Sequence, residues 1–191
     1  FNLSETIFVQ RPANPAHTAR VRIFFPTAEI PFAGHPTIGC AIHLAGAMGE
    51  GDFDRAIVLE EEAGLVPVRV WRRGSTTKAE FVAPVIPHGA TGAVVAPAAK
   101  IAAALDLHAE EIGFASHQPA VWQGGPRFMY VPVDSLGALA RARPMEPAWS
   151  EVIRAAGVDS IYLYTPGIDC DFRARMYSPT AGIPEDPATG S

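Results

Sequence analysis

Glu5 is the first residue whose type and surroundings suggest proton-transfer chemistry. It lies in a β-branched and aromatic run, residues 2–10, in which strand alternation places its side chain on the same face as Leu3 and Ile7. Burial beside apolar neighbours raises the pKa of a carboxyl group, so such a glutamate can take a proton from a substrate and return it elsewhere. The alternative is an exposed glutamate on an edge strand, and strand position alone favours that alternative.

Two more polar residues, His35 and Asp186, each stand immediately before a proline. His35 lies in A-G-H-P-T-I-G and Asp186 in E-D-P-A-T-G-S. The imidazole could donate a proton, orient a substrate or cap a helix, and a lone histidine is more often structural. The aspartate could cap a helix and accept hydrogen bonds from a substrate amine or hydroxyl, while Gly190 and Ser191 allow close approach and offer a donor.

The loops around these residues belong to an internal repeat. Residues 22–31 (R-I-F-F-P-T-A-E-I-P) and 175–184 (R-M-Y-S-P-T-A-G-I-P) agree at six of ten positions, and after a two-residue gap His35 aligns with Asp186. Each copy predicts a strand, a loop, a polar residue at a helix N-cap and a proline at the first helical position. The repeat favours two lobes related by a pseudo-twofold axis, with two helix N-termini facing one cleft that binds a carboxylate.

The hydrophobic pattern predicts the elements that position these residues. In the first half we expect strands at 2–10 and 20–25, a helix at 36–48, and an antiparallel meander at 56–61, 65–71 and 78–82. The helix is hydrophobic nearly all round, which predicts burial between layers. In the second half we expect helices at 97–106, 135–142 and 149–156, and strands at 128–133, 160–164 and 172–177. The segment 84–99 is the expected linker, and we expect a first lobe at 1–90 and a second at 91–191.

Composition excludes several classes of protein. The 191 residues are 48% hydrophobic and 18% charged, which is enough for a sizeable core. A net charge of −5 without a basic cluster argues against nucleic acid as a partner. Neither a long apolar run nor a secretory pattern is present, so we expect no membrane association and a cytoplasmic location. The chain begins at Phe1 and stops at Ser191 inside the second loop, so both ends look cut.

The cysteines and glycines do not indicate a metal, a thiol mechanism or a nucleotide cofactor. Cys40 and Cys170 are expected to be reduced and buried, and no second Cys/His pair completes a zinc site with Cys40 and His43. Racemases that use two thiols place them at paired helix starts, and these two cysteines lie elsewhere. The glycines form no strand-linked phosphate-binding motif, so we expect no nucleotide cofactor.

Three segments together resemble the PhzF family of phenazine-biosynthesis proteins. They are residues 2–9 (N-L-S-E-T-I-F-V), 22–39 (R-I-F-F-P-T-A-E-I-P-F-A-G-H-P-T-I-G) and 175–191 (R-M-Y-S-P-T-A-G-I-P-E-D-P-A-T-G-S). The resemblance implies an α+β, diaminopimelate-epimerase-like fold with two pseudo-symmetric lobes, each a β-sheet wrapped around a central helix. It also implies a homodimer and further chain at both ends.

The resemblance also implies a function and a set of site residues. The function is that of a cofactor-independent, metal-free isomerase that moves a proton on a small cyclic or amino-acid-like carboxylate similar to dihydro-hydroxyanthranilate. Glu5 would be the general acid/base, and His35 and Asp186 would be its polar partners at the substrate. The implied substrate-binding positions are Ser4, Gly34, Gly190 and Ser191. Related epimerases place cysteines at the two helix starts, where this chain has residues such as Ala33 and Pro187.

Two alternatives to this isomerase remain open. One is an amino-acid racemase or epimerase, in which Glu5 works with His35 or Asp186 on the opposite face of a stereocentre. The other is a binding protein for small acids that catalyses nothing. Isotope exchange from solvent distinguishes the enzymes from the binding protein.

Overall fold

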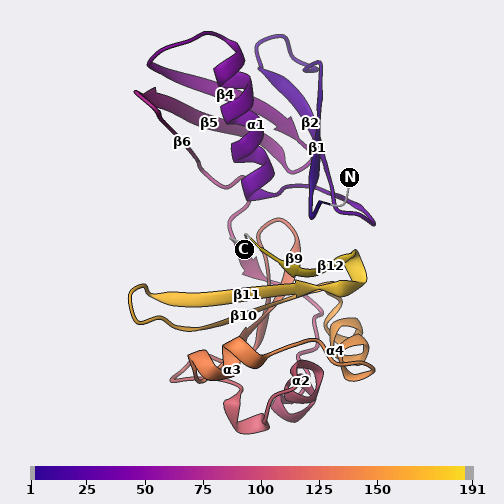
Figure 1. Ribbon diagram of the computed structural model, residues 1–191. Helices are drawn as coiled ribbons and strands as arrows, with labels where there is room; N and C mark the ends of the chain where they lie inside the picture. The colour runs from indigo at the N-terminus through magenta and orange to yellow at the C-terminus, as the bar shows by residue number, and fades with distance from the viewer. Residues whose placement is uncertain (1–2, 188–191) are drawn as a thin grey trace. The chain divides into compact units, whose positions relative to one another are not determined.

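The computed structural model describes residues 3–187, which divide into two compact units (Figure 1). The described part of the first unit is residues 3–86 together with 124–126, and that of the second is 87–123 and 127–187. Each unit contains one sheet with helices packed on it, so the chain has the mixed α+β class expected from its sequence. Within residues 3–187 no helix has the length and apolar character needed to cross a membrane.

The first unit is a strongly twisted sheet with one long helix on it. Its elements are β1 (Thr6–Gln10), β2 (Ala19–Phe24), β3 (Glu29–Ile30), α1 (Gly34–Ala47), β4 (Phe53–Glu61), β5 (Gly64–Arg73) and β6 (Thr76–Phe81). The strand order is β1-β2-β4-β5-β6, with β3 paired to β2. The first two strands pair antiparallel, and the expected antiparallel meander is confirmed, whereas β2 and β4 run parallel.

Helix α1 packs on one face of this sheet, and Figure 1 shows it crossing β4 and β5. Its buried side contributes Cys40, Ala41 and Ala45 to a core that includes the fully buried Ile57 and Leu59 of β4. The helix was expected to be buried between layers, and in the described residues one side of it packs on the sheet while the other side is exposed. His35, Gly39 and His43 form an exposed line along it, because these residues recur every four positions on the side turned away from the sheet.

The second unit has six strands and three α-helices among its described residues. They are β7 (His88–Gly89), α2 (Ala98–Leu105), β8 (Ala120–Gln123), β9 (Arg127–Pro132), α3 (Leu136–Arg141), α4 (Ala148–Ala156), β10 (Ser160–Pro166), β11 (Phe172–Ser178) and β12 (Ile183–Asp186), with short 3-10 turns at Ala109–Glu111 and Pro179–Ala181. The strand order is β12-β11-β10-β9-β8-β7, with β9 and β10 parallel. The expected helices and long strands are present, but the short β7, β8 and β12 were not expected, and β7 lies inside the expected linker.

The core of the second unit lies between its sheet and its helices, which Figure 1 shows on one side of the sheet. Trp149 of α4 is fully buried there with Ile161 and Leu163 of β10. Tyr162 and Tyr164 alternate onto the other face of the same strand, where they are only half-buried. This alternation fixes the register of β10, because a slip by one residue would turn its apolar side chains away from the helices.

The internal repeat is visible as a shared local structure. In each copy an arginine stacks on the aromatic ring two residues later and forms a two-point ion pair with a glutamate of the next strand. These residues are Arg22, Phe24 and Glu29 in the first unit and Arg175, Tyr177 and Glu185 in the second. The guanidinium carbons lie 5.0 and 4.9 Å from the ring centres. A chance similarity between the two repeat sequences would not explain why both copies form these same contacts.

Candidate functional site

Glu5 lies directly before β1, an edge strand of the first sheet, yet its side chain is only 7% exposed. The alternative that it is an exposed edge-strand glutamate is therefore wrong. Leu3, which was expected to share its apolar face, is 61% exposed. A shared apolar strand face with Leu3 therefore does not explain the burial of Glu5. Part of that burial comes from its contact with His35 of α1.

His35 of α1 lies against this carboxylate. Its Nε2 atom is 3.0 Å from Oε2 of Glu5, and its side chain is 51% exposed. A buried carboxyl group and a half-exposed imidazole in direct contact can share or exchange a proton. The structure thus brings together two of the three residues that the sequence predicted to carry chemistry.

Ser4 and Gly34 are chain neighbours of these two residues, and both are half-buried. A Cβ atom on Gly34 would lie 3.9 Å from the Phe81 ring, an ordinary van der Waals contact, so packing does not require glycine there. Gly34 is the first residue of α1, where backbone N–H groups have no partner within a helix. Its role in holding a substrate stays a prediction, as does that of Ser4.

The N-cap of α1 differs from the expectation. The helix begins at Gly34 with Ala33 as its N-cap, so His35 is the second helical residue and Pro36 the third. No side chain caps the N-terminus. His35 is therefore directed at Glu5 rather than at its own helix, which removes the structural explanation of this histidine as a cap.

Asp186 belongs to the second unit. It is the last residue of β12, opposite Met176 of β11, and it is 7% exposed. The helix that the sequence predicts after Asp186 falls outside the described residues, so its role as an N-cap stays a prediction. Gly190 and Ser191 lie outside the described residues. A common site of Asp186 with the residues of the first unit stays a prediction.

The two cysteines are free but differ in their surroundings. Cys40 is buried in α1, and desolvation together with the nearby Glu61 raises the pKa of its thiol to about 11. Cys170 lies in the turn between β10 and β11 and is exposed, which corrects its expected burial. Neither lies at the start of α1. Across residues 3–187 no three His, Cys, Asp or Glu side chains are grouped in a way that could hold a metal ion.

Glu61 is a buried acid that the sequence analysis missed. It is the last residue of β4 and is 9% exposed. Its Oε1 atom lies 2.7 Å from the hydroxyl oxygen of Thr37 in α1, and burial raises the pKa of its carboxyl group to about 7. The signal was available in the sequence, because Glu61 continues the alternation of Ile57 and Leu59 toward the core.

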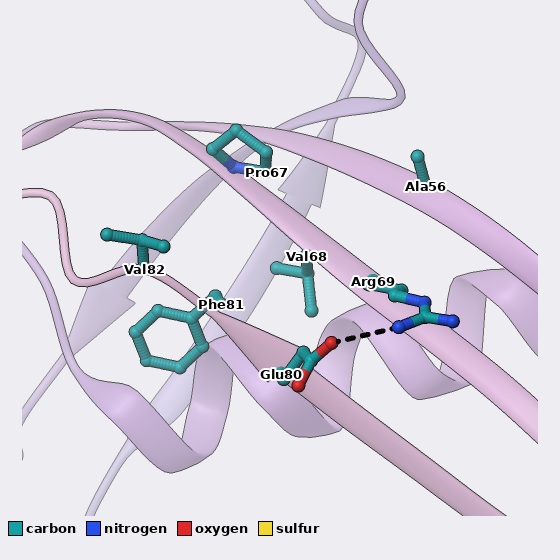
Figure 2. A pocket seen from close by; sticks show the side chains of 7 residues that line it. All are labelled: Ala56, Pro67, Val68, Arg69, Glu80, Phe81 and Val82. Carbon is teal, nitrogen blue, oxygen red and sulfur yellow. Dashed lines mark hydrogen bonds and ion pairs between the residues drawn. The ribbon is translucent and has the colours of Figure 1, made fainter.

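A pocket of about 380 Å³ on the meander does not share this chemistry (Figure 2). It is lined by Ala56, Pro67, Val68, Arg69, Glu80, Phe81 and Val82. Figure 2 shows Arg69 and Glu80 reaching toward each other across two strands, with Nη1 and Oε1 3.2 Å apart. Most of the lining residues are exposed on the sheet face opposite α1.

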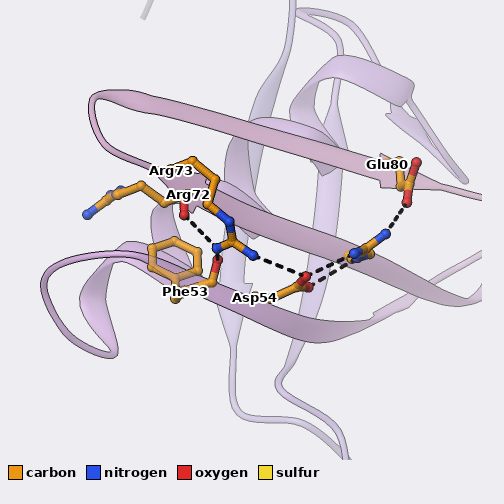
Figure 3. A network of polar contacts seen from close by, with 6 residues as sticks. Phe53, Asp54, Arg72, Arg73 and Glu80 are labelled. Atoms are coloured by element: carbon orange, nitrogen blue, oxygen red, sulfur yellow. Dashed lines mark hydrogen bonds and ion pairs between the residues drawn. The ribbon is translucent and has the colours of Figure 1, made fainter.

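The same arginine belongs to a network of cross-strand contacts (Figure 3). Arg69 also binds Asp54 through two hydrogen bonds, at 3.1 and 2.9 Å, and these hold the pKa of that carboxyl group below its usual value. Arg73 donates to the Phe53 carbonyl at 3.0 Å. Because every charge here is exposed and paired along the strands, we assign this network to sheet register rather than to ligand binding.

Comparison with known proteins gives a consistent result. The family model described as phenazine biosynthesis-like protein matches residues 1–191. An uncharacterised isomerase of Mesorhizobium japonicum is 42% identical over 200 residues, covering 100% of this chain and 64% of the relative. The trans-2,3-dihydro-3-hydroxyanthranilate isomerase of Pseudomonas aeruginosa is 36% identical over 190 residues, covering 100% of this chain and 62% of the relative. The chain thus spans somewhat less than two thirds of the curated relatives it matches.

Solved structures confirm the fold class. A predicted epimerase from Pseudomonas aeruginosa superposes with a TM-score of 0.77 at 31% identity, covering 98% of this chain and 63% of that chain. A probable proline racemase from Agrobacterium radiobacter gives a TM-score of 0.57 at 14% identity, covering 95% and 54%, which is a likeness of fold alone. The expected epimerase-like α+β fold is therefore confirmed.

Proposed function

Because this chain belongs to the phenazine biosynthesis-like (PhzC-PhzF) family, we propose that the whole protein is an isomerase that moves a proton on a small carboxylate without a cofactor. The substrate class is a cyclic or amino-acid-like acid similar to dihydro-hydroxyanthranilate. Support for that class comes from the 36% identical isomerase of Pseudomonas aeruginosa, whose name states this substrate.

The observation that carries the proposal is the contact between Glu5 and His35. The carboxylate is 7% exposed and lies 3.0 Å from an imidazole that is 51% exposed. The buried carboxyl group thus contacts a side chain that solvent and a small substrate can reach. The imidazole is positioned to orient that substrate and to compensate charge on the glutamate.

The reaction proceeds by proton transfer alone. Glu5 removes a proton from a carbon of the substrate, so that the C–H electron pair enters the π-system and the carboxylate becomes a carboxylic acid. The carboxylic acid, whose proton exchanges with solvent while Glu5 holds it, then protonates another carbon, and the double bond shifts accordingly. Atoms and electrons balance within substrate and glutamate, and general acid/base catalysis of this kind contributes about 10²–10⁴-fold to a rate.

A racemase with two thiols is the weaker alternative. The Cys40 thiol is neutral near pH 7 because its pKa is about 11, and Cys170 lies in an exposed turn rather than at a helix start. Epimerisation by Glu5 with a second, non-thiol acid remains a candidate, since the 31% identical solved structure is described as a predicted epimerase. In that case Asp186 would be the second acid.

The test is solvent isotope exchange by the whole protein. Wild type and Glu5→Gln are incubated in D₂O with dihydro-hydroxyanthranilate and a panel of amino and hydroxy acids, and deuterium is located by NMR. Glu62→Gln is the matched control, because it removes an exposed carboxylate of the same unit. We expect allylic deuterium with wild type and the control, and a loss of about 10²-fold or more with Glu5→Gln.

Other outcomes are equally informative. Deuterium at a stereocentre, with products of both configurations, would favour the epimerase. Binding without exchange across the whole panel would contradict the enzyme and favour a binding protein. We also propose a cytoplasmic homodimer; a monomeric mass by light scattering would refute the dimer.

A further inference from the structure

Thr37 of α1 makes two contacts that a single hydroxyl proton cannot serve. Its oxygen lies 2.7 Å from the carbonyl oxygen of Ala33 and also 2.7 Å from Oε1 of Glu61. Both are hydrogen-bond distances, and a hydroxyl group has one proton to donate. If Glu61 were ionised, one of these two oxygen pairs would have no proton between them and would repel.

A protonated Glu61 resolves this conflict. Its O–H then donates to the Thr37 oxygen, and the Thr37 proton remains available for the Ala33 carbonyl. The other carboxyl oxygen, Oε2, is buried without a hydrogen-bond partner among the described residues. An unpartnered carbonyl oxygen costs much less free energy than an unpartnered anionic oxygen, so this environment also favours the neutral acid.

We propose that Glu61, as a carboxylic acid, is a positioning residue that holds the first turn of α1 through Thr37 and thereby keeps His35 against Glu5. The chain of donors runs from Glu61 to Thr37 and on to the N-cap carbonyl of Ala33. This role rests on the proposed function of the Glu5–His35 pair. Glu61 acts on that pair only through the helix.

The groups around Glu61 do not offer a counter-charge. On α1 the facing titratable group is the Cys40 thiol, which is neutral because its pKa is raised to about 11. On β2, Arg20 and Arg22 are exposed and alternate with buried neighbours, so they point away from the core. On β5 the residue opposite Glu61 is Gly64. Desolvation therefore dominates and raises the pKa of Glu61 to about 7, so the donor chain breaks as pH rises past neutrality.

The first test follows the proton on Glu61 and needs no substrate. Infrared difference spectra of the whole protein, wild type minus Glu61→Gln, are recorded from pH 5 to 9. We expect the band of a buried protonated carboxyl group at pH 5 and its loss around pH 7. The backbone N–H resonances of Gly34 and Thr37 in the first turn of α1 should shift with the same midpoint in wild type but not in Glu61→Gln, whose amide still donates to Thr37. Absence of the band, or a pH-dependent shift of these resonances that Glu61→Gln leaves unchanged, would overturn the proposal.

The second test concerns the rate. In wild type we expect kcat to decline above pH 7. Glu61→Gln should keep a kcat within about threefold of wild type at pH 6 and should not show this decline. Thr37→Val should lower kcat about tenfold at every pH, and Thr37→Ser should restore it. Identical pH profiles in wild type and Glu61→Gln would refute the positioning role while leaving the proposed function intact. If wild type exchanges no substrate proton at all, the proposed function fails, and the infrared and NMR result still decides whether Glu61 holds the helix.

Discussion

His35 Nε2 lies 3.0 Å from Glu5 Oε2, and the two side chains differ sevenfold in exposure, 51% against 7%. A substrate that approaches from solvent therefore meets the imidazole before it meets the carboxylate. Under the proposed function, this order fits a role of His35 in binding and orientation and a role of Glu5 in the proton transfer itself. The two roles can be separated by substitution.

His35→Asn should raise KM and lower kcat/KM by about 10–100-fold, because orientation is lost while the acid remains. Stability should change by no more than about 0.5 kcal/mol, as for other exposed side chains. Steady-state kinetics and urea unfolding check both expectations. His43→Asn, on the same exposed line of α1, is the control, and an equal loss there would contradict a specific role for His35.

Glu61 should make the first unit less stable as pH rises. Its folded pKa of about 7 exceeds the ordinary value of 4.5, so its stabilising contribution is complete below pH 4.5 and is lost between there and pH 7. The shift from 4.5 to about 7 corresponds to roughly 3 kcal/mol. Urea unfolding of wild type and Glu61→Gln at pH 5 and 8 measures this difference. If the difference in unfolding free energy between wild type and Glu61→Gln is the same at pH 5 and pH 8, this prediction is wrong.

The thiols should react at very different rates. Cys170 is exposed, whereas Cys40 is buried with a pKa of about 11, and only thiolates attack disulfide reagents quickly. Native protein treated with an aromatic disulfide at pH 8 should therefore be modified at Cys170 and not at Cys40, as read by peptide mass mapping. Denatured protein should be modified at both. Rapid native labelling of Cys40 would show that α1 opens readily.

The two repeat arginines should differ in their contribution to stability. Arg175 donates to the carbonyls of Leu139, Ala140 and Ala142 at 2.8–3.1 Å, in addition to its ion pair. Arg175→Met removes the donor to the carbonyls of Leu139 and Ala140, while that of Ala142 keeps the Tyr177 hydroxyl, and it should cost about 2 kcal/mol. Arg22→Met removes the equivalent exposed pair and should change the free energy of unfolding little. Equal effects in thermal unfolding would contradict this difference.

Much of the fold follows from sequence periodicity, but short paired elements do not. The alternation in residues 56–61 and the helical spacing after Pro36 predict β4 and α1 well. The two-residue strands β3 and β7 have too little sequence for a period, and only pairing with a distant strand defines them. The lobe boundary between residues 90 and 91 stays a prediction.

The site was predicted in part and for partly wrong reasons. Glu5 is buried as expected, but the exposed Leu3 is not the cause. Glu61 was missed although the expected strand at 56–61 includes it, because a charged residue at the end of a strand is usually exposed. The N-cap was misplaced because a histidine before a proline resembles a capping residue, and only the backbone dihedral of Ala33 shows where the helix begins.

The parallel pairing of β2 with β4 has a consequence for the order of folding. The strands β4, β5 and β6 are joined by two-residue turns and can pair locally, whereas β2 can join them only after the whole segment through α1 has closed. Native-state hydrogen exchange should therefore show β1, β2 and α1 opening together, at a lower free energy than the meander. Glu5 precedes β1, and His35 lies in the first turn of α1. The contact between them would therefore form in the last cooperative step of folding of the first unit and break in the first step of its unfolding.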